Sequence, residues 1–333
     1  MSNFTYRSDP IRIVFGPGAV SALRAEAELH KMSRLLLLCS KSRADFARRV
    51  TASVADRTVG ICDASAPNMP REAFDRIVAD LKRLNAEGFI VVGGGSPIGL
   101  AKAAAAATKL PYIAIVTTYS GSEMAARWYV GVADKRISGD DRACLPATAI
   151  YDPELTLDLP ARMSAASGMN AMAHAVESLY SIDTNPVVQT MAEEAVRRLG
   201  ASLPQLVDNP RDLAARTDAL YGAWLAANFR AEIGLEHAIA TPYAVGFNSA
   251  AAPDAMERIK RALGAADAAR GLYDLNVRIG LPTGLKGLGM REEDIAKAVE
   301  VVGAVKITHP RPVSKPDLAE IIRQVYFGEP PRF

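Results

Sequence analysis

Apolar residues in the first half of the chain form short, nearly continuous runs, instead of alternating with polar ones. These runs cover residues 11–15, 34–39, 58–62, 88–92 and 111–118. Such runs are typical of parallel strands that helices cover on both faces. Segments with helical spacing separate them, at 18–31, 42–54, 70–86 and 97–108. The repeated strand–helix order predicts a doubly wound, mostly parallel sheet with right-handed crossovers.

The second half of the chain has a different pattern, because β-branched runs almost vanish after residues 147–153. Helical patterns lie near 161–181, 186–207, 210–230, 251–263, 266–279, 291–303 and 316–326. Their breaks contain Pro, Gly, Asn or Asp, which commonly end helices. The sequence therefore predicts an α/β domain over residues 1–155 and an all-helical domain over residues 156–333.

Composition narrows the class of function. The length of 333 residues fits two domains. The 39 basic and 37 acidic side chains give a net charge of +2, which removes the electrostatic reason to expect nucleic acid or an anionic membrane as partner. The 3 cysteines are far apart, as in proteins of a reducing cytoplasm. No apolar run is long enough for a membrane helix. We expect a soluble, cytoplasmic protein that acts on small molecules.

A glycine-rich loop follows the predicted strand at 88–92. It reads Gly93-Gly94-Gly95-Ser96-Pro97 and precedes a predicted helix, with Ser96 suited to its N-cap and Pro97 to its first turn. Glycines let the backbone approach a ligand, and free N–H groups at a helix N-terminus attract anions. We therefore expect the pyrophosphate of a dinucleotide here. The alternative is a tight turn without a ligand.

The next strand ends in polar residues. Thr117, Thr118 and Ser120 follow it, where open α/β sheets bind ligands, and beside the glycine loop they favour a dinucleotide site over a merely polar loop. The earlier run at 34–39 ends at Ser40 with no acidic residue at its tip. Because a carboxylate there selects NADH, its absence admits NADPH as well as NADH. Lys41 or Arg43 could meet the additional phosphate, or form only a solvated basic turn.

Asn170 and His174 form the second informative pair. They lie four residues apart in the predicted helix at 161–181, so they share one face of it. The small residues around them leave room for a ligand. A lone histidine on an apolar helix is usually a core residue, but the paired asparagine favours an active-site role.

Several of these segments together resemble a known family. FGPGAV, GGGSPIGLAK, TTYSGSE, AIYDPELTLDLP, GMNAMAHAVESLY and HPRPV are similar, in order, to motifs of the iron-containing alcohol dehydrogenase superfamily, and most similar to those of its maleylacetate reductases. The resemblance implies a nucleotide-binding α/β domain, a helical domain and an active site in the cleft between them. It also implies NADH or NADPH as cofactor, Leu157 among the cofactor contacts, and a homodimer.

The resemblance bears on metal binding through Asn170. Metal-dependent members have an aspartate at this position, and it ligates the metal together with the histidine four residues on. Asparagine is a weaker, neutral ligand. Maleylacetate reductases resemble this chain in having Asn, which implies catalysis without a metal and a substrate-cleft or proton-donor role for His174. A metal-dependent alcohol or polyol dehydrogenase is the alternative.

A departure from the family pattern lies near residue 233. The family has a His-rich stretch there, of which only His237 and the following ATPYAVGFN match. Either residues of a longer chain are missing from this sequence, or the segment is deleted and the protein is a catalytically impaired nucleotide-binding protein. The intact motifs elsewhere favour the first explanation.

The resemblance also implies a reaction. It is the NAD(P)H-dependent reduction of maleylacetate, a small dicarboxylate, to 3-oxoadipate in the degradation of aromatic compounds. His174 or His237 would donate the proton, and Asn170 would lie in the same cleft. An arginine is the natural partner of a substrate carboxylate, with Arg127 as first candidate. The further candidates are Arg136, Arg142, Lys306 and Arg311.

Overall fold

The chain divides into two compact units. The computed structural model describes residues 3–132, 135–229, 238–305 and 310–333. One unit comprises Ser8–Leu159, and the other comprises Met1–Arg7 together with Pro160–Phe333. The division therefore falls after Leu159, beyond the residue 155 that the sequence suggests, and the first residues of the chain group with the helical unit.

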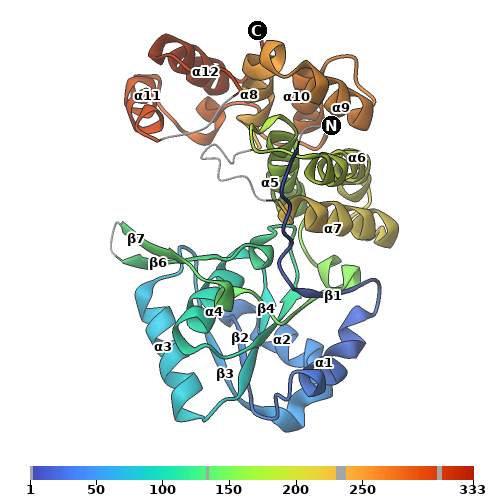
Figure 1. The fold of residues 1–333 in the computed structure, drawn as a ribbon, viewed down its shortest axis with the longest axis vertical. Coiled ribbons are helices and arrows are strands. Elements are labelled where there is room, and N and C mark those ends of the chain that lie inside the picture. The colour runs from blue at the N-terminus through green and yellow to red at the C-terminus, as the bar shows by residue number, and fades with distance from the viewer. Residues whose placement is uncertain (1–2, 133–134, 230–237, 306–309) are drawn as a thin grey trace. The chain divides into compact units, whose positions relative to one another are not determined.

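The first unit is built on a six-stranded parallel sheet with the order β1-β8-β5-β4-β2-β3 (Figure 1). Its strands are β1 (Arg12–Phe15), β2 (Leu35–Ser40), β3 (Thr58–Ser65), β4 (Gly88–Gly93), β5 (Tyr112–Val116) and β8 (Thr148–Tyr151). The predicted parallel, doubly wound sheet is confirmed. Every residue of β5 is buried, which explains why its sequence shows no polar alternation.

Helices cover both faces of this sheet. They are α1 (Leu23–Leu29), α2 (Ala44–Val50), α3 (Arg71–Arg83) and α4 (Gly95–Thr108), joined by the short 3-10 turns η1 (Ala19–Ala22), η2 (Lys41–Arg43) and η3 (Ala52–Arg57). Leu35 and Leu37 of β2 share a core with α1 and α2. Leu36, on the opposite face of the strand, lies beside Leu84 at the end of α3. The chain therefore crosses from one face to the other after β3, between α2 and α3.

A two-stranded antiparallel hairpin departs from the sequence prediction. It consists of β6 (Arg127–Val132) and β7 (Lys135–Asp140) and is not part of the main sheet. The N–H of Gly131 donates to the carbonyl of Met69 at 2.9 Å, and a Cβ at Gly131 would lie 2.6 Å from the carbonyl oxygen of Asn68. β7 is mostly exposed and β6 is only partly buried, so the sequence lacks the apolar run that marks the main strands.

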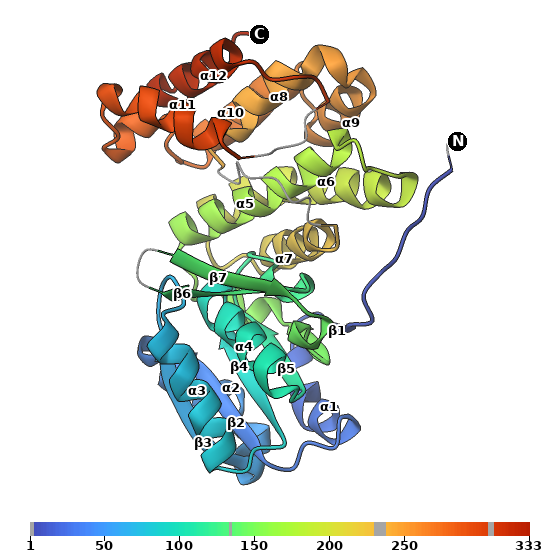
Figure 2. The same ribbon diagram turned by 60° about the vertical axis from the view of Figure 1, so that its left-hand side comes forward.

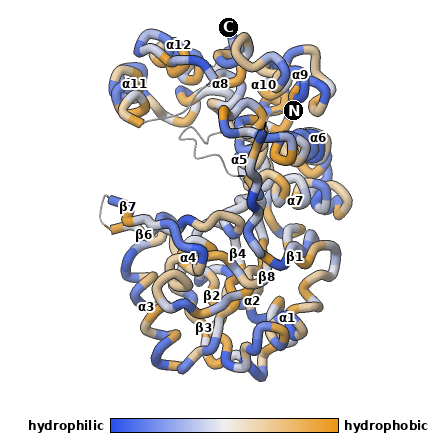
Figure 3. Tube along the Cα trace, in the orientation of Figure 1, coloured by the Kyte–Doolittle hydropathy of each residue, from blue (hydrophilic) through white to orange (hydrophobic). Residues whose placement is uncertain are grey.

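The second unit is helical, as predicted (Figure 2). Its helices are α5 (Ala161–Tyr180), α6 (Pro186–Asp208), α7 (Leu213–Ala227), α8 (Thr241–Asn248), α9 (Pro253–Leu263), α10 (Ala268–Arg278), α11 (Ile295–Gly303) and α12 (Lys315–Phe327). The sequence pattern did not predict α8, because all residues of this helix are buried and it therefore shows no amphipathic spacing. Figure 3 shows hydrophilic and hydrophobic residues alternating along α9 and α11, which made those helices predictable.

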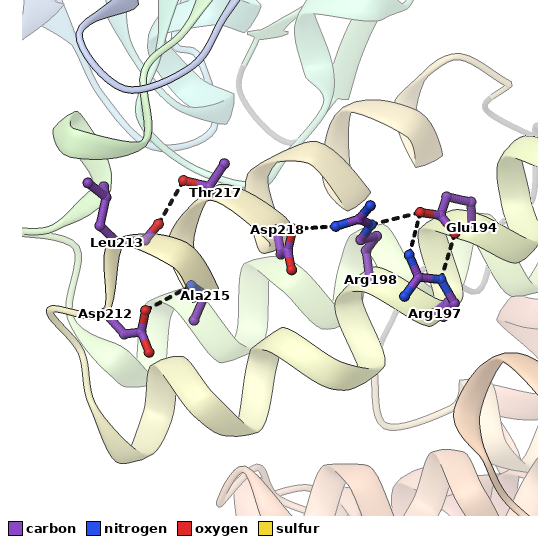
Figure 4. Close-up of polar contacts among 8 residues, drawn as sticks. All are labelled: Glu194, Arg197, Arg198, Asp212, Leu213, Ala215, Thr217 and Asp218. Atoms are coloured by element: carbon purple, nitrogen blue, oxygen red, sulfur yellow. Dashed lines mark hydrogen bonds and ion pairs between the residues drawn. The ribbon is translucent and has the colours of Figure 1, made fainter.

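A cluster of ion pairs on α6 includes one that joins it to α7 (Figure 4). Arg198 of α6 binds Glu194 at 2.7 Å and Asp218 of α7 at 2.6 Å, while Arg197 also binds Glu194. Hydrogen bonds from both guanidinium groups lower the pKa of Glu194 to about 2. Asp212 caps α7 by accepting from the N–H of Ala215. Arg198 thus links α6 to α7 through its ion pair with Asp218.

No helix in the described part of the chain is both long and apolar enough to cross a membrane.

Candidate functional site

The glycine loop exposes backbone because its neighbours leave no room for side chains. Gly93 has a φ of +156°, and a Cβ there would lie 2.6 Å from the Cγ of Pro97. A Cβ on Gly94 would lie 2.4 Å from the Oγ1 of Thr118. Both distances are far below van der Waals contact, so glycine is required at these two positions for steric reasons.

Helix α4 begins directly after this loop. It starts at Gly95 with Gly94 as N-cap, and no side chain caps it. The expectation that Ser96 is the N-cap is wrong, because the helix begins one residue before Ser96; Pro97 lies in the first turn, as expected. With no side-chain cap, N–H groups at the start of α4 remain available to an anion.

Polar side chains of the neighbouring loop face the glycines. Gly93 pairs with Val116 across β4 and β5, and the N–H of Thr117 donates to the carbonyl of Gly93 at 3.1 Å. The Oγ1 of Thr118 and the Oγ of Ser120 are buried, and neither has a hydrogen-bond partner among the described residues. Buried hydroxyls without partners cost free energy unless a ligand or water satisfies them. The loop therefore fits a ligand with phosphate oxygens.

A buried polar network lies behind this loop. The Nζ of Lys102 on α4 donates to the carbonyl of Ser122 at 2.8 Å, and the hydroxyl of Tyr151 donates to Glu123 at 2.6 Å. Burial and the charge of Glu123 raise the pKa of Tyr151 well above its ordinary value, so its hydroxyl stays protonated and donates. None of these side chains was among the residues predicted from the sequence. The signal was a lysine within the apolar helix GLAKAAAAA.

Ser40 lies at the same edge of the sheet as the glycine loop. β2 pairs with β4, with Leu38 opposite Val91, so Ser40 and Gly93 each follow two residues later. The structure thus brings together the predicted positions on β2, β4 and β5. Leu157 directly follows η6 (Pro153–Thr156) beyond β8 and is half-buried. Its role as a cofactor contact stays a prediction.

The pair Asn170 and His174 lies on α5 of the helical unit. Asn170 is exposed, whereas His174 is only 5% exposed. The residues from Ala171 to Tyr180 are all buried, and the hydroxyl of Ser178 donates to the carbonyl of His174 at 2.7 Å. One end of the pair is thus accessible, and the imidazole lies in tightly packed surroundings. An imidazole so held can act as a proton donor.

The candidate arginines differ in what already binds them. Arg127 is exposed at the start of β6, and Arg136 lies 4.8 Å from the ring centroid of Tyr129. Arg142 is ion-paired with Asp9, and Arg311 stacks on Phe247 with its Cζ 3.9 Å from the ring centroid. The ion pair makes Arg142 a poorer candidate for a substrate carboxylate. The predictions for His237 and Lys306 fall outside the described residues.

Two observations on the described residues bear on metal binding. Among them, no group of three or more His, Cys, Asp or Glu side chains could hold one. Position 170 contributes a neutral amide beside His174, where a carboxylate would bind a divalent cation far better.

Comparison with known proteins places the chain in a family. The family model described as iron-containing alcohol dehydrogenase matches residues 10–153, and the C-terminal model of the same family matches residues 164–242 and 227–326. The chain belongs to the iron-containing alcohol dehydrogenase family. The predicted oxidoreductase class is therefore confirmed.

The relatives refine this placement. Maleylacetate reductase of Burkholderia cepacia is 40% identical, covering 99% of this chain and 100% of its own length. Maleylacetate reductase of Sphingobium indicum is 38% identical, covering 98% of this chain and 99% of its own. The crystal structure of maleylacetate reductase from Agrobacterium tumefaciens has a TM-score of 0.94 at 31% identity and covers 99% of this chain and 100% of that one. The expected likeness to maleylacetate reductases is confirmed.

The same comparisons bear on the missing His-rich segment. The alignment with the Burkholderia cepacia relative spans 353 positions against 333 residues here, so at least the difference of 20 positions is absent from this chain. The two matches of the C-terminal model overlap at residues 227–242, around the site of the expected departure. The segment at 230–237 itself lies outside the described residues.

Proposed function

We propose that this chain reduces maleylacetate to 3-oxoadipate with NADH or NADPH, without a metal ion. The observation that carries this proposal is full-length similarity to maleylacetate reductases at up to 40% identity among the relatives reported above, combined with Asn170 in place of a metal-ligating carboxylate. The bound nicotinamide would supply a hydride to the carbon–carbon double bond that is conjugated to the ketone. We further propose that the protein acts in the cytoplasm as a homodimer.

The residues of each unit have distinct roles in this proposal. The backbone N–H groups at the start of α4 and the hydroxyls of Thr118 and Ser120 would bind the cofactor phosphates. His174 would donate the proton that completes the reduction, since hydride addition leaves an enolate that needs one proton. Arg127 would attract a substrate carboxylate, and its exposed position supports this role.

The fit of a nicotinamide dinucleotide rests on chemistry within the α/β unit. A pyrophosphate needs several N–H and O–H donors and close approach of the backbone. The loop offers glycines at three consecutive positions, an uncapped helix start and two buried hydroxyls that lack hydrogen-bond partners among the described residues. The backbone N–H groups and the two hydroxyls can donate hydrogen bonds, and none of these groups carries a negative charge that would repel phosphate.

The shorter chain supports a second candidate, a nucleotide-binding protein with impaired catalysis. At least 20 positions of the Burkholderia cepacia relative have no counterpart here, and the two matches of the C-terminal model overlap at 227–242. Under this alternative the α/β unit still binds dinucleotide, while turnover is absent.

One optical assay separates the candidates. Oxidation of NADH and NADPH is followed with maleylacetate, and in parallel with simple aldehydes and ketones, with and without added Zn²⁺ or Fe²⁺. We expect oxidation with maleylacetate that a chelator leaves unchanged. Oxidation only with aldehydes and only with metal would establish a metal-dependent alcohol dehydrogenase. Dinucleotide binding without any turnover would establish the impaired protein.

A further inference from the structure

Two tethers hold the polar loop that follows β5 and carries two buried hydroxyls. At the start of the loop, the N–H of Thr117 donates to the carbonyl of Gly93 at 3.1 Å. At its other end, the Nζ of Lys102 donates to the carbonyl of Ser122 at 2.8 Å. The first tether joins backbone to backbone, whereas the second depends on one side chain of α4. The position of the loop between the two tethers therefore depends on Lys102.

The second tether matters because a glycine precedes it. Gly121 has a φ of +66°, in the left-handed region that favours glycine. Glycine restrains the backbone less than any other residue, so by itself it fixes Ser120 only weakly relative to Ser122. The bond from Lys102 to the Ser122 carbonyl supplies the missing restraint.

The loop lies along one face of α4. A Cβ on Gly94 would lie 2.4 Å from the Oγ1 of Thr118, and one on Gly95 would lie 4.0 Å from the Oγ of Ser120. Lys102 follows Gly95 by seven residues, which is about two helical turns, so both residues lie on the same face of the helix. The start of α4 thus meets the two hydroxyls, and a later turn of the same helix holds the end of the loop.

Lys102 is buried within an apolar helix, which is costly for a cation. Its exposed fraction is only 3%, and the residues from Ile98 to Ala105 are all buried. An apolar side chain here would avoid the desolvation of an ammonium group. The residue directly after Ser122 is Glu123, a fully buried anion, so the cluster contains both charges. The cost of burying Lys102 indicates that its bond to the loop has a specific role.

We propose that Lys102 is a positioning residue for dinucleotide binding. By holding the end of the loop, it keeps the hydroxyls of Thr118 and Ser120 in register with the N–H groups at the start of α4, so that both sets of donors reach the same phosphates. These hydroxyls are buried and have no hydrogen-bond partner among the described residues. Because O–H···O bonds span about 2.5–3.0 Å, a loop that moves by about 1 Å loses them. The proposal rests on the proposed function only for the presence of a dinucleotide.

The first test is Lys102→Met, which keeps a side chain of similar length but cannot donate. Binding of NADH and NADPH to the full chain is measured by titration calorimetry, below the unfolding temperature of each variant. We expect Lys102→Met to weaken both dinucleotides about tenfold, because charge-assisted hydrogen bonds to phosphate are lost. An unchanged affinity for NADH and NADPH overturns the proposal.

Thr148→Val is the matched control. It removes a fully buried hydroxyl of the same unit, which donates to Glu26 at 2.8 Å. Thr148 pairs with Ile113 near the start of β5, whereas the loop follows the end of that strand. This variant also loses a buried hydrogen bond, but it should change both affinities by less than about twofold, because the two places are independent.

A double-mutant cycle separates positioning from general stability. Thr118→Val removes one phosphate-binding hydroxyl and should weaken NADH about tenfold in the otherwise unchanged chain. In the Lys102→Met background the same change should weaken NADH by less than about threefold, because the hydroxyl is already displaced. A merely structural role for Lys102 would leave the two effects additive, and additive effects overturn the proposal.

A second variant covers the case in which Lys102→Met does not fold, since that change removes one of two buried opposite charges. Lys102→Met combined with Glu123→Gln removes both charges and keeps an amide oxygen that accepts from Tyr151. It still lacks the donor to Ser122, so a loss of NADH affinity of about tenfold is again expected. Full NADH affinity in this chain overturns the proposal, because only the balance of charge would then matter.

The outcomes also separate this inference from the proposed function. If the unchanged chain binds NADH but does not reduce maleylacetate, while Lys102→Met binds NADH about tenfold more weakly, the proposed reaction fails and the inference stands. If maleylacetate is reduced and Lys102→Met binds NADH with unchanged affinity, only the inference fails. If the unchanged chain binds neither dinucleotide, both fail together.

Discussion

The glycine loop and helix α5 carry the two candidate functional features, and they are built in opposite ways. In the α/β unit the ligand-binding groups are mainly backbone, and glycines keep them accessible: a Cβ on Gly94 would lie 2.4 Å from Thr118. In the helical unit the chemistry depends on side chains, Asn170 and His174, on one helix face. Glycine has a different use there, since Gly168 lets Leu203 of α6 pack against α5.

The two sites are therefore sensitive to different kinds of substitution. A backbone site fails when a neighbour gains volume, whereas a side-chain site fails when one functional group is lost. The polar networks of the two units also differ, in how deeply their charged side chains are buried. Glu123 and Lys102 of the α/β unit are buried, while Glu194 and its arginines lie near the surface of the helical unit.

The largest effect is expected at the side-chain site. His174→Gln should lower kcat for maleylacetate reduction by about 10²- to 10⁴-fold, because the proton donor is lost. Binding of NADH should stay the same within experimental error. His30→Gln is the control, since that histidine binds Thr148 in the other unit. Full activity in His174→Gln would show that His174 is only a core residue.

The backbone site is tested next by adding one methyl group. Gly94→Ala places a Cβ against Thr118 and should weaken dinucleotide binding about tenfold or more, with a loss of stability of about 1–3 kcal/mol. Gly287→Ala is the matched control, because its Cβ would meet nothing within 4 Å. Adding Thr118→Ala to Gly94→Ala should recover stability without recovering affinity. Undiminished binding in Gly94→Ala would contradict a backbone-built site.

A buried hydroxyl is the next test, on the stability of the α/β unit. Tyr151→Phe removes one buried hydrogen bond to Glu123 and should lower the free energy of unfolding by about 1–3 kcal/mol, because a bond to a buried carboxylate is lost. Chemical denaturation measures this. Tyr129→Phe, on the partly exposed hairpin, should change stability far less. Equal losses of unfolding free energy in the two variants would show that the buried Tyr151 hydroxyl contributes no more to stability than the partly exposed Tyr129 hydroxyl.

The smallest effect concerns the surface ion pairs of the helical unit. The pKa of Glu194 is lowered to about 2 in the folded protein from an ordinary 4.5. Its stabilisation is therefore complete above pH 4.5 and is lost as the pH falls towards 2. Glu194→Gln should reduce the loss of stability across this range, measured by denaturant titration at several pH values. An unchanged pH profile would mean that solvent screens the pair completely.

Local patterns predicted most of the secondary structure correctly. Five of the six main-sheet strands, all but β8, were predicted because helices cover the sheet on both faces, so their apolar runs are nearly continuous. The hairpin β6–β7 and helix α8 were missed for opposite reasons: the first is too exposed and the second too buried to show periodicity. Within the candidate site, Gly93, Gly94 and Thr118 were found from their position at strand ends. Lys102 and Glu123 were not, since their burial depends on contacts with distant segments; for Lys102 the one local signal is a lysine within an apolar helix.

The sequence by itself determined most of the order of strands and helices, the glycine loop, and the asparagine four residues before His174. These are local features, which depend only on residue type and on spacing along the chain. Only the tertiary structure decided that β2 lies beside β4, that Arg43 is stacked whereas Arg142 is ion-paired, and that the Thr118 and Ser120 hydroxyls are buried without partners among the described residues. Those facts depend on contacts between segments distant in the chain, which spacing along one segment does not encode.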